Sequence, residues 1–275
     1  MHAARCAQTD RFRRRAGRRA LGGYDAAPAI IIVAQMVSDE MFNPQIETTS
    51  SMFTAAVFDM DGLLLDSERP IRNAWFQVAR QAGVALSDAV YLDAVGRNWA
   101  DTRATISRLF GDELAFERAQ ASVDKMLSDR YGVQGYALKD GVIELLAALR
   151  KRGVPCCVAS STKAAEVRRR LEQACISGYF HAIAGGDEVA RGKPHPDLFV
   201  LAARRLGVNP GRCLVFEDSE YGAWGAVAAG MSAVIVPDLK TPTADTQAMC
   251  VAQLQTLVQA IPLCEFWFEQ MSGPK

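Results

Sequence analysis

The sequence has no excess of charge of either sign. Its 31 lysines and arginines match its 31 aspartates and glutamates, so the formal net charge at pH 7 is zero. A chain without a field of one sign has no general attraction for nucleic acid or for an anionic membrane. Long apolar runs are also missing, because the stretch 27–37 is shorter than the about 20 residues needed to cross a bilayer. We therefore expect neither nucleic acid nor membrane as a partner.

Cysteines at the spacing of a metal or redox motif are absent as well. The seven cysteines include no C-x-x-C pair, and no histidine lies near them at zinc spacing. Cys156, Cys157 and Cys213 fall inside apolar runs, where a free thiol behaves as a small hydrophobic group. The pattern predicts no disulfide framework and no zinc site, and it favours the reducing cytoplasm as the location.

The first 51 residues differ in composition from the remainder. They contain seven arginines and no lysine, and most of these arginines lie in the segment 11–20. Such an arginine-rich start is compatible with a transit peptide or an arm that binds nucleic acid. Met52, however, directly precedes the first convincing strand. We expect residues 1–51 to be a disordered extension ahead of the folded part.

From residue 53 onward, short apolar runs alternate with longer segments of helical period. This alternation is typical of an α/β fold, in which a parallel sheet carries helices on both faces. Nearly continuous hydrophobicity indicates strands buried on both sides. The predicted strands are 53–58, 154–160, 181–186, 212–218 and 232–238, and the predicted helices between them are 140–152, 162–174, 195–206 and 219–229.

One insertion interrupts this alternation. Residues 67–136 contain no good strand, but they contain amphipathic stretches at 69–82, 101–110 and 113–130. A helical unit inserted after the first strand would lie over the carboxyl ends of the strands, where open α/β sheets bind ligands. We therefore predict the following division: extension 1–51, α/β core 52–66 and 137–265, helical cap 67–136, and tail 266–275. Ser67, Glu68 and Gly132–Gly135 are candidate hinges.

Acidic side chains follow two of the predicted strands. The first strand ends in FDMDG, which supplies Asp59 and Asp61, and Gly62 allows a sharp bend. The fourth ends in FEDS, which adds Glu217 and Asp218. Carboxylates brought together at one sheet edge repel unless a proton or cation intervenes, and Mg²⁺ prefers oxygen ligands. Taken singly, either motif could equally cap the helix that follows it.

Two further signals follow other strands. The second strand ends at Ser160 in a hydroxyl-rich turn, where backbone N–H groups at a helix start can hold phosphate. The segment 191–199 places Lys193 ahead of a helix that opens with proline. Each signal is weak alone, because serine caps helices and surface lysines are usually solvated. Four motifs in order at four strand ends favour one shared anion site. We expect His195 to shape its motif rather than act as a base.

These motifs resemble those of a known family. D-M-D-G at 59–62, S-S-T at 160–162, K-P-H-P-D at 193–197 and E-D-S at 217–219 are similar, in order and spacing, to the four motifs of the haloacid dehalogenase superfamily. The helical insertion after the first motif is similar to the branch that holds β-phosphoglucomutase and small sugar-phosphate phosphatases. The resemblance covers about residues 53–240. It implies a Rossmann-like parallel-sheet core with an inserted α-helical cap.

The resemblance also implies a mechanism that depends on Mg²⁺. Asp59 would be the nucleophile and would form an aspartyl-phosphate, which divides one difficult displacement into two easier ones. Asp61 would be the general acid/base. The metal would be held by the Asp59 carboxylate, the Asp61 backbone carbonyl and Asp218, with Glu217 coordinating directly or through water.

Phosphate binding and the reaction class follow from the same resemblance. Ser160 and the N–H of Ser161 would hold phosphate oxygens, and Lys193 would bridge phosphate and nucleophile. These roles imply a phosphatase that hydrolyses a small phosphomonoester, plausibly a sugar phosphate. A phosphomutase of the β-phosphoglucomutase type shares every core motif and stays open as an alternative, as does a non-catalytic module that binds a phosphometabolite. A dehalogenase is disfavoured, because that chemistry lacks the second aspartate, here Asp61.

The cap contains a candidate specificity segment at 95–102. Gly96 permits a tight turn, and Arg97 and Asn98 offer hydrogen-bond donors to a sugar hydroxyl or a distal anion. An ordinary turn between helices, with Arg97 in solvent, is the alternative. The expected partner is a small phosphorylated metabolite, and we expect a monomer or weak homodimer. The segment 265–268 is predicted to be a terminal packing patch or a dimer contact.

Overall fold

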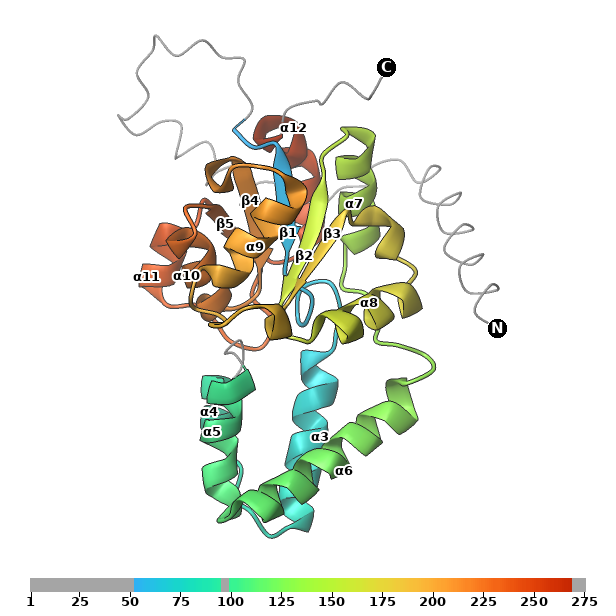
Figure 1. Ribbon diagram of the computed structural model, residues 1–275, viewed down its shortest axis with the longest axis vertical. Coiled ribbons are helices and arrows are strands. Elements are labelled where there is room, and N and C mark those ends of the chain that lie inside the picture. Colours follow the sequence, from blue (N-terminus) through green and yellow to red (C-terminus); the bar gives the residue numbers. More distant parts are fainter. Residues whose placement is uncertain (1–51, 95–98, 269–275) are drawn as a thin grey trace.

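The computed structural model describes residues 52–94 and 99–268. In this part of the chain a six-stranded sheet carries helices on both faces, and a helical unit projects from one end of it (Figure 1). All neighbouring strands pair in parallel, in the order β3-β2-β1-β4-β5-β6. The predicted α/β fold class is therefore confirmed. The strands are β1 (Ala55–Phe58), β2 (Cys156–Ser160), β3 (Ala182–Gly185), β4 (Cys213–Glu217), β5 (Ser232–Ile235) and β6 (Ala252–Gln253).

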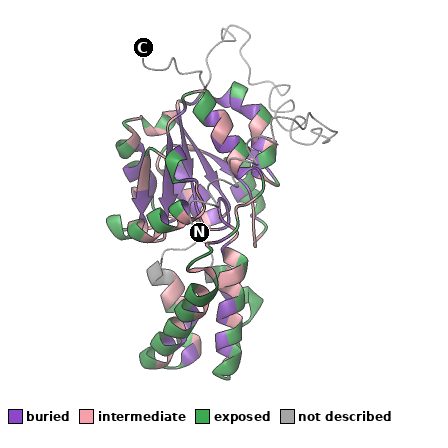
Figure 2. Ribbon diagram, turned by 90° about the vertical axis from the view of Figure 1, so that its right-hand side faces the viewer, coloured by how far each residue is buried: buried purple, intermediate pink, exposed green. Residues whose placement is uncertain are grey.

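The sheet is buried because helices cover both of its faces. Every residue of β1, β2 and β4 is buried, and Figure 2 shows the buried residues concentrated along the strands. On one face, apolar residues of α9 (Asp197–Leu206) and α10 (Glu220–Ala228) pack on the sheet. On the other face, α7 (Val142–Lys151) and α8 (Ala164–Gln173) do so. The near-continuous hydrophobicity of the strands follows from this double burial.

The C-terminal part closes the second face of the sheet. The 3-10 helix η4 (Leu257–Leu263) and α12 (Cys264–Trp267) contribute buried residues to that core. Trp267 packs on Phe216 with ring centroids 6.0 Å apart, and Phe268 packs on Phe53 at 6.3 Å. Packing was one of the two roles predicted for the segment 265–268, and the rings of Trp267 and Phe268 have this role. The remaining elements are α11 (Ala244–Met249), η1 (Ser177–Tyr179), η2 (Gly186–Glu188) and η3 (Pro210–Arg212).

The inserted helices form a second packing unit. They are α3 (Glu68–Gln81), α4 (Asp88–Ala94), α5 (Trp99–Phe110) and α6 (Glu113–Tyr131). Their apolar residues make a cluster separate from the two faces of the sheet, with Trp75 stacked on Phe116 at 5.9 Å. The helical insertion is therefore confirmed, whereas its exact boundaries stay a prediction. None of the helices in the described ranges is long and apolar enough to cross a membrane.

The two connections between core and insertion lie side by side. The N–H of Asp66 donates to Ala137 O at 2.9 Å, and the N–H of Lys139 donates to Leu64 O at 3.0 Å. The chain therefore leaves and re-enters the core at one place, next to the carboxyl end of β1 (Figure 1). Any rotation of the insertion against the core must take place about this pair of connections.

Candidate active site

The site begins where β1 ends. β1 lies at the centre of the sheet, and the chain order reverses there, because β2 lies on one side of it and β4 on the other. Such a reversal leaves a crevice at the carboxyl ends of the strands. Asp59 is held at this edge by a hydrogen bond of 3.0 Å from its N–H to Phe216 O. Gly62 follows with φ of +86°, and a Cβ at that position would lie 2.2 Å from Asp218 Oδ2. The first motif thus needs its glycine for both backbone conformation and space.

Three carboxylates converge at this edge. Oxygen atoms of Asp59, Glu217 and Asp218 all lie within 4.8 Å of one another. Lys193 is 2% exposed, and its ammonium donates to Asp59 Oδ1 at 2.5 Å and to Glu217 Oε1. Glu217 is also fixed by Ser219, whose hydroxyl donates to Oε2 at 3.0 Å. The structure therefore brings together four of the predicted site residues, from three segments that are far apart in sequence.

Burial dominates the protonation of this cluster. It raises the pKa of Asp59 to about 8, and the Glu217 and Asp61 carboxylates add to the rise, while Lys193 opposes it. Burial and the neighbouring carboxylates Asp59 and Glu217 raise the pKa of Asp218 as well. Burial alone would lower the pKa of Lys193, but Asp59 and Glu217 raise it overall. One ammonium therefore does not neutralise three buried acids.

This donor set fits a hard divalent cation. All the converging atoms are carboxylate oxygens, the ligand type that Mg²⁺ takes in proteins. A bound cation would also supply the positive charge that the raised pKa values of Asp59 and Asp218 show to be lacking. The cluster is therefore a candidate metal site.

The turn after β2 lies at the same edge of the sheet as the acidic cluster. Ser160 is 1% exposed, and its Oγ accepts a hydrogen bond of 3.1 Å from the N–H of Thr162. The Ser161 hydroxyl oxygen is buried and has no hydrogen-bond partner in the part of the chain that the structure describes. Two hydroxyls and a helix start thus lie at the same sheet edge as Asp59, an arrangement compatible with an anion.

Asp61 differs from the other acids of the predicted site. Its side chain is not one of the three that converge, and it accepts three hydrogen bonds from other residues. Ser67 Oγ donates to Oδ1 at 2.7 Å, Arg170 Nη1 donates to Oδ1 at 2.6 Å, and Thr162 Oγ1 donates to Oδ2 at 2.9 Å. The predicted metal contact of Asp61 is through its backbone carbonyl, which these side-chain bonds do not involve.

Three further residues belong to this site although sequence analysis gave them no chemical role. Arg170 and Thr162 hold Asp61. Glu68 adjoins the turn, because its Cγ would lie 3.3 Å from a Cβ on Gly62. Burial raises the pKa of Glu68 to about 8, and the Asp61 and Asp59 carboxylates add to the rise. Sequence analysis gave Glu68, the first residue of α3, only as a hinge candidate, and nothing in the spacing of α8 singled out Arg170.

The predicted specificity residues Gly96, Arg97 and Asn98 lie outside the described residues. Their roles stay predictions. His195 is exposed, and its expected role in shaping the motif stays a prediction.

Comparison with known proteins identifies the chain. Residues 53–230 match the family of haloacid dehalogenase-like hydrolases. The chain belongs to this family. The fructose-1-phosphate phosphatase YqaB of Escherichia coli is 34% identical over 189 residues, which are 67% of this chain and 96% of that protein. The phosphorylated carbohydrates phosphatase of Thermotoga maritima is 29% identical over 202 residues, 72% of this chain and 92% of that protein.

A solved structure shows the same fold for this haloacid dehalogenase-like hydrolase. CbbY from Rhodobacter sphaeroides, crystallised with phosphate, superposes with a TM-score of 0.62 at 24% identity, and the match covers 76% of this chain and 96% of that one. The resemblance drawn from the four motifs is therefore confirmed, as is the predicted enzyme class, a phosphatase of this family.

Proposed function

We propose that this protein is a Mg²⁺-dependent phosphatase that hydrolyses a small phosphomonoester, such as a sugar phosphate, through an aspartyl-phosphate intermediate. The observation that carries the proposal is the convergence of Asp59, Glu217 and Asp218 around the buried Lys193 at the switch point of the sheet. A set of three carboxylates and one ammonium has no evident structural use, because burying them costs free energy.

The residues divide the reaction between them. Ser160, the N–H of Ser161 and Lys193 bind the phosphate and orient phosphorus toward Asp59. Asp59 attacks, the bond to the leaving oxygen breaks, and Asp61 gives that oxygen a proton. Asp61 then takes a proton from the water that attacks the aspartyl-phosphate, which releases phosphate and restores Asp59.

The metal site is part of this proposal. Asp59, Asp218, the backbone carbonyl of Asp61 and Glu217 would hold Mg²⁺, with Glu217 acting directly or through water. When bound, the ion supplies positive charge that lets an anionic carboxylate approach an anionic phosphate. Lys193 supplies the second positive charge from the protein side.

The substrate class is supported by the relatives and by charge. Two of these relatives are named for fructose 1-phosphate and for phosphorylated carbohydrates. A chain with no net charge has no general attraction for a polyanion, so recognition depends on the local anion site. A small phosphate ester that fits between core and insertion is a substrate that such a local anion site can recognise.

Phosphate release across a panel of hexose phosphates, triose phosphates and glycerol phosphates, with Mg²⁺ and with EDTA, tests the proposal. We expect release with Mg²⁺ for at least one ester and loss of release with EDTA. Net isomerisation of a hexose phosphate without free phosphate would show the phosphomutase instead. Binding without turnover of any ester would show the non-catalytic module.

Stability is expected to depend on pH and Mg²⁺ together. Asp59 and Glu68 each have a pKa of about 8 in the folded protein, above the ordinary carboxyl value. Between about pH 4 and pH 8 the folded state therefore binds more protons than the unfolded state, so the free energy of unfolding of the metal-free protein falls as pH rises through this window. Because a cation competes with these protons, Mg²⁺ should raise Tm more near pH 8 than near pH 5. Thermal melts with EDTA and with Mg²⁺ at both pH values measure this, and an equal rise at both would contradict it.

A further inference from the structure

The Arg170 guanidinium joins two carboxylates beneath the site. Its Nη1 donates to Asp61 Oδ1 at 2.6 Å, and its Nε donates to Glu166 Oε1 at 2.8 Å. The side chain is only 14% exposed and lies over the Tyr136 ring, with the guanidinium carbon 5.2 Å from the ring centroid. Burial alone would lower the pKa of Arg170, but the Asp61 and Glu166 carboxylates raise it overall. Arg170 is thus a fixed cation in contact with the proposed acid/base.

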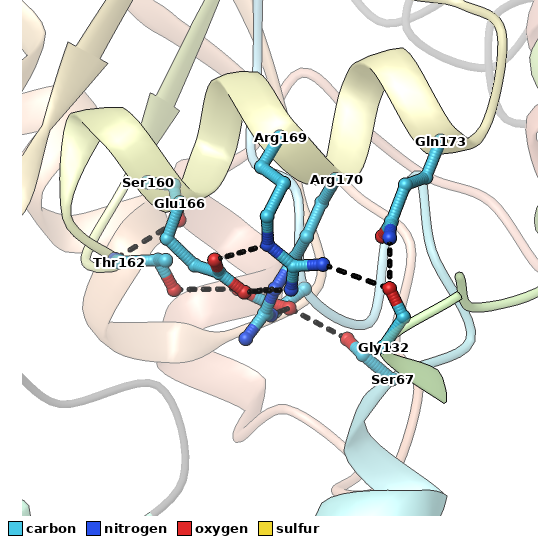
Figure 3. A network of polar contacts seen from close by, with 9 residues as sticks. Ser67, Gly132, Ser160, Thr162, Glu166, Arg169, Arg170 and Gln173 are labelled. Atoms are coloured by element: carbon cyan, nitrogen blue, oxygen red, sulfur yellow. Dashed lines mark hydrogen bonds and ion pairs between the residues drawn. The ribbon is translucent and has the colours of Figure 1, made fainter. Parts of the chain in front are cut away.

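The helix α8 holds Arg170 in place. α8 is anchored on the sheet by Val167 and Leu171, both fully buried. Glu166 lies one turn before Arg170 and accepts hydrogen bonds from it and from Arg169 (Figure 3). The position of the guanidinium therefore follows from the helix and from its i, i+4 pair.

The three donors fix the orientation of the Asp61 carboxylate. A carboxylate has about four acceptor positions on its two oxygens. Two donors, from Ser67 and Arg170, occupy Oδ1, and one, from Thr162, occupies Oδ2. One position on Oδ2 is left for the proton that the proposed reaction transfers. Of the three donors only Arg170 carries charge and holds its geometry through a second carboxylate, so it contributes most to the orientation.

We propose that Arg170 is a positioning residue that holds the Asp61 carboxylate in the orientation needed for proton transfer to the leaving oxygen. The inference rests on the proposed phosphatase function. Arg170 donates no proton to substrate; it acts through Asp61, which protonates the leaving oxygen as the phosphorus–oxygen bond breaks.

Two esters whose leaving groups differ in basicity can distinguish a positioning role of Arg170 from a purely structural role. Phenolate is a strong base that needs a proton as it leaves, whereas p-nitrophenolate is a weak base that leaves readily without one. Phenyl phosphate and p-nitrophenyl phosphate are otherwise alike in size and charge. The two esters share the later hydrolysis of the aspartyl-phosphate, so the comparison is made with kcat/KM, which reports the steps through departure of the leaving group. Arg170→Gln should therefore lower kcat/KM for phenyl phosphate by about tenfold or more, and kcat/KM for p-nitrophenyl phosphate by less than about threefold.

Arg168→Gln on the same helix is the matched control, because Arg168 is exposed; it should leave both rates unchanged. Glu166→Gln, which removes the second anchor of Arg170, should show the same selective loss in smaller degree, and it serves as the test if Arg170→Gln does not fold. Equal losses for the two esters, no loss, or a gain would overturn the positioning role alone. A wild-type protein that releases phosphate neither from these two esters nor from any ester of the panel above would overturn the proposed function as well.

Discussion

Asp59→Asn is expected to lower the rate of phosphate release by at least about 10⁴-fold, because the substitution removes the nucleophile on which every later step depends. The fold should be retained. Asparagine has nearly the same size, and the pKa of Asp59, raised to about 8 by burial, shows that the ionised carboxylate is unfavourable at this position. The free energy of unfolding of the metal-free variant should therefore equal or exceed that of the wild type near pH 8.

Steady-state kinetics and thermal melts of Asp59→Asn measure both expectations. Asp124→Asn is the matched control, because Asp124 is exposed on α6 and its contact is with Gln120 at 2.7 Å. The control should keep wild-type activity. Substantial turnover by a folded Asp59→Asn protein would remove Asp59 from the role of nucleophile.

Lys193→Met should affect both activity and stability. Lys193 donates to the buried carboxylates of Asp59 and Glu217, so methionine leaves two acids without their ammonium partner. Breaking a buried ion pair by removing one partner costs about 3–5 kcal/mol. We expect a loss of unfolding free energy of that order near pH 8 and a smaller loss near pH 5, where Asp59 takes up a proton. Phosphate release should fall at least about 10³-fold, because Lys193 also stabilises the charge of the phosphoryl group.

Denaturant unfolding at the two pH values measures the stability change. Lys125→Met is the control, since Lys125 is exposed and pairs with the exposed Asp129 at 2.8 Å; such pairs contribute about 0–1 kcal/mol. If Lys193→Met and Lys125→Met lose similar amounts of unfolding free energy, the buried lysine does not neutralise the acidic cluster.

The core of the fold could be predicted because its strands are buried on both faces. Continuous apolar runs such as 154–160 have few interpretations once glycine-terminated helices separate them. β6 was missed, since Ala252–Gln253 is too short to show a pattern. α4 was missed for a related reason, because its seven residues form less than two complete turns of amphipathic period.

The site residues that lie at the ends of strands could be predicted from the sequence. Asp59 and Asp218 follow strands directly and Glu217 ends β4, so parallel pairing alone brings them to one edge. Lys193 could be placed there only by its motif. Arg170 could not be predicted, because its contact with Asp61 spans 109 positions and depends on how α8 is rotated on the sheet. The substrate-reading part of the cap stays a prediction, because residues 95–98 lie outside the described ranges.

The central claim, that Asp59 accepts the phosphoryl group, is tested most directly by trapping the intermediate in Asp61→Asn. This variant keeps the nucleophile but cannot activate water, and p-nitrophenyl phosphate needs no acid to form the intermediate. We predict a burst of about one equivalent of p-nitrophenolate per enzyme followed by little turnover. Mass spectrometry of the acid-quenched protein should then place one phosphoryl group on Asp59. A burst with the phosphoryl group on another residue, or unphosphorylated protein after full turnover, would contradict the account.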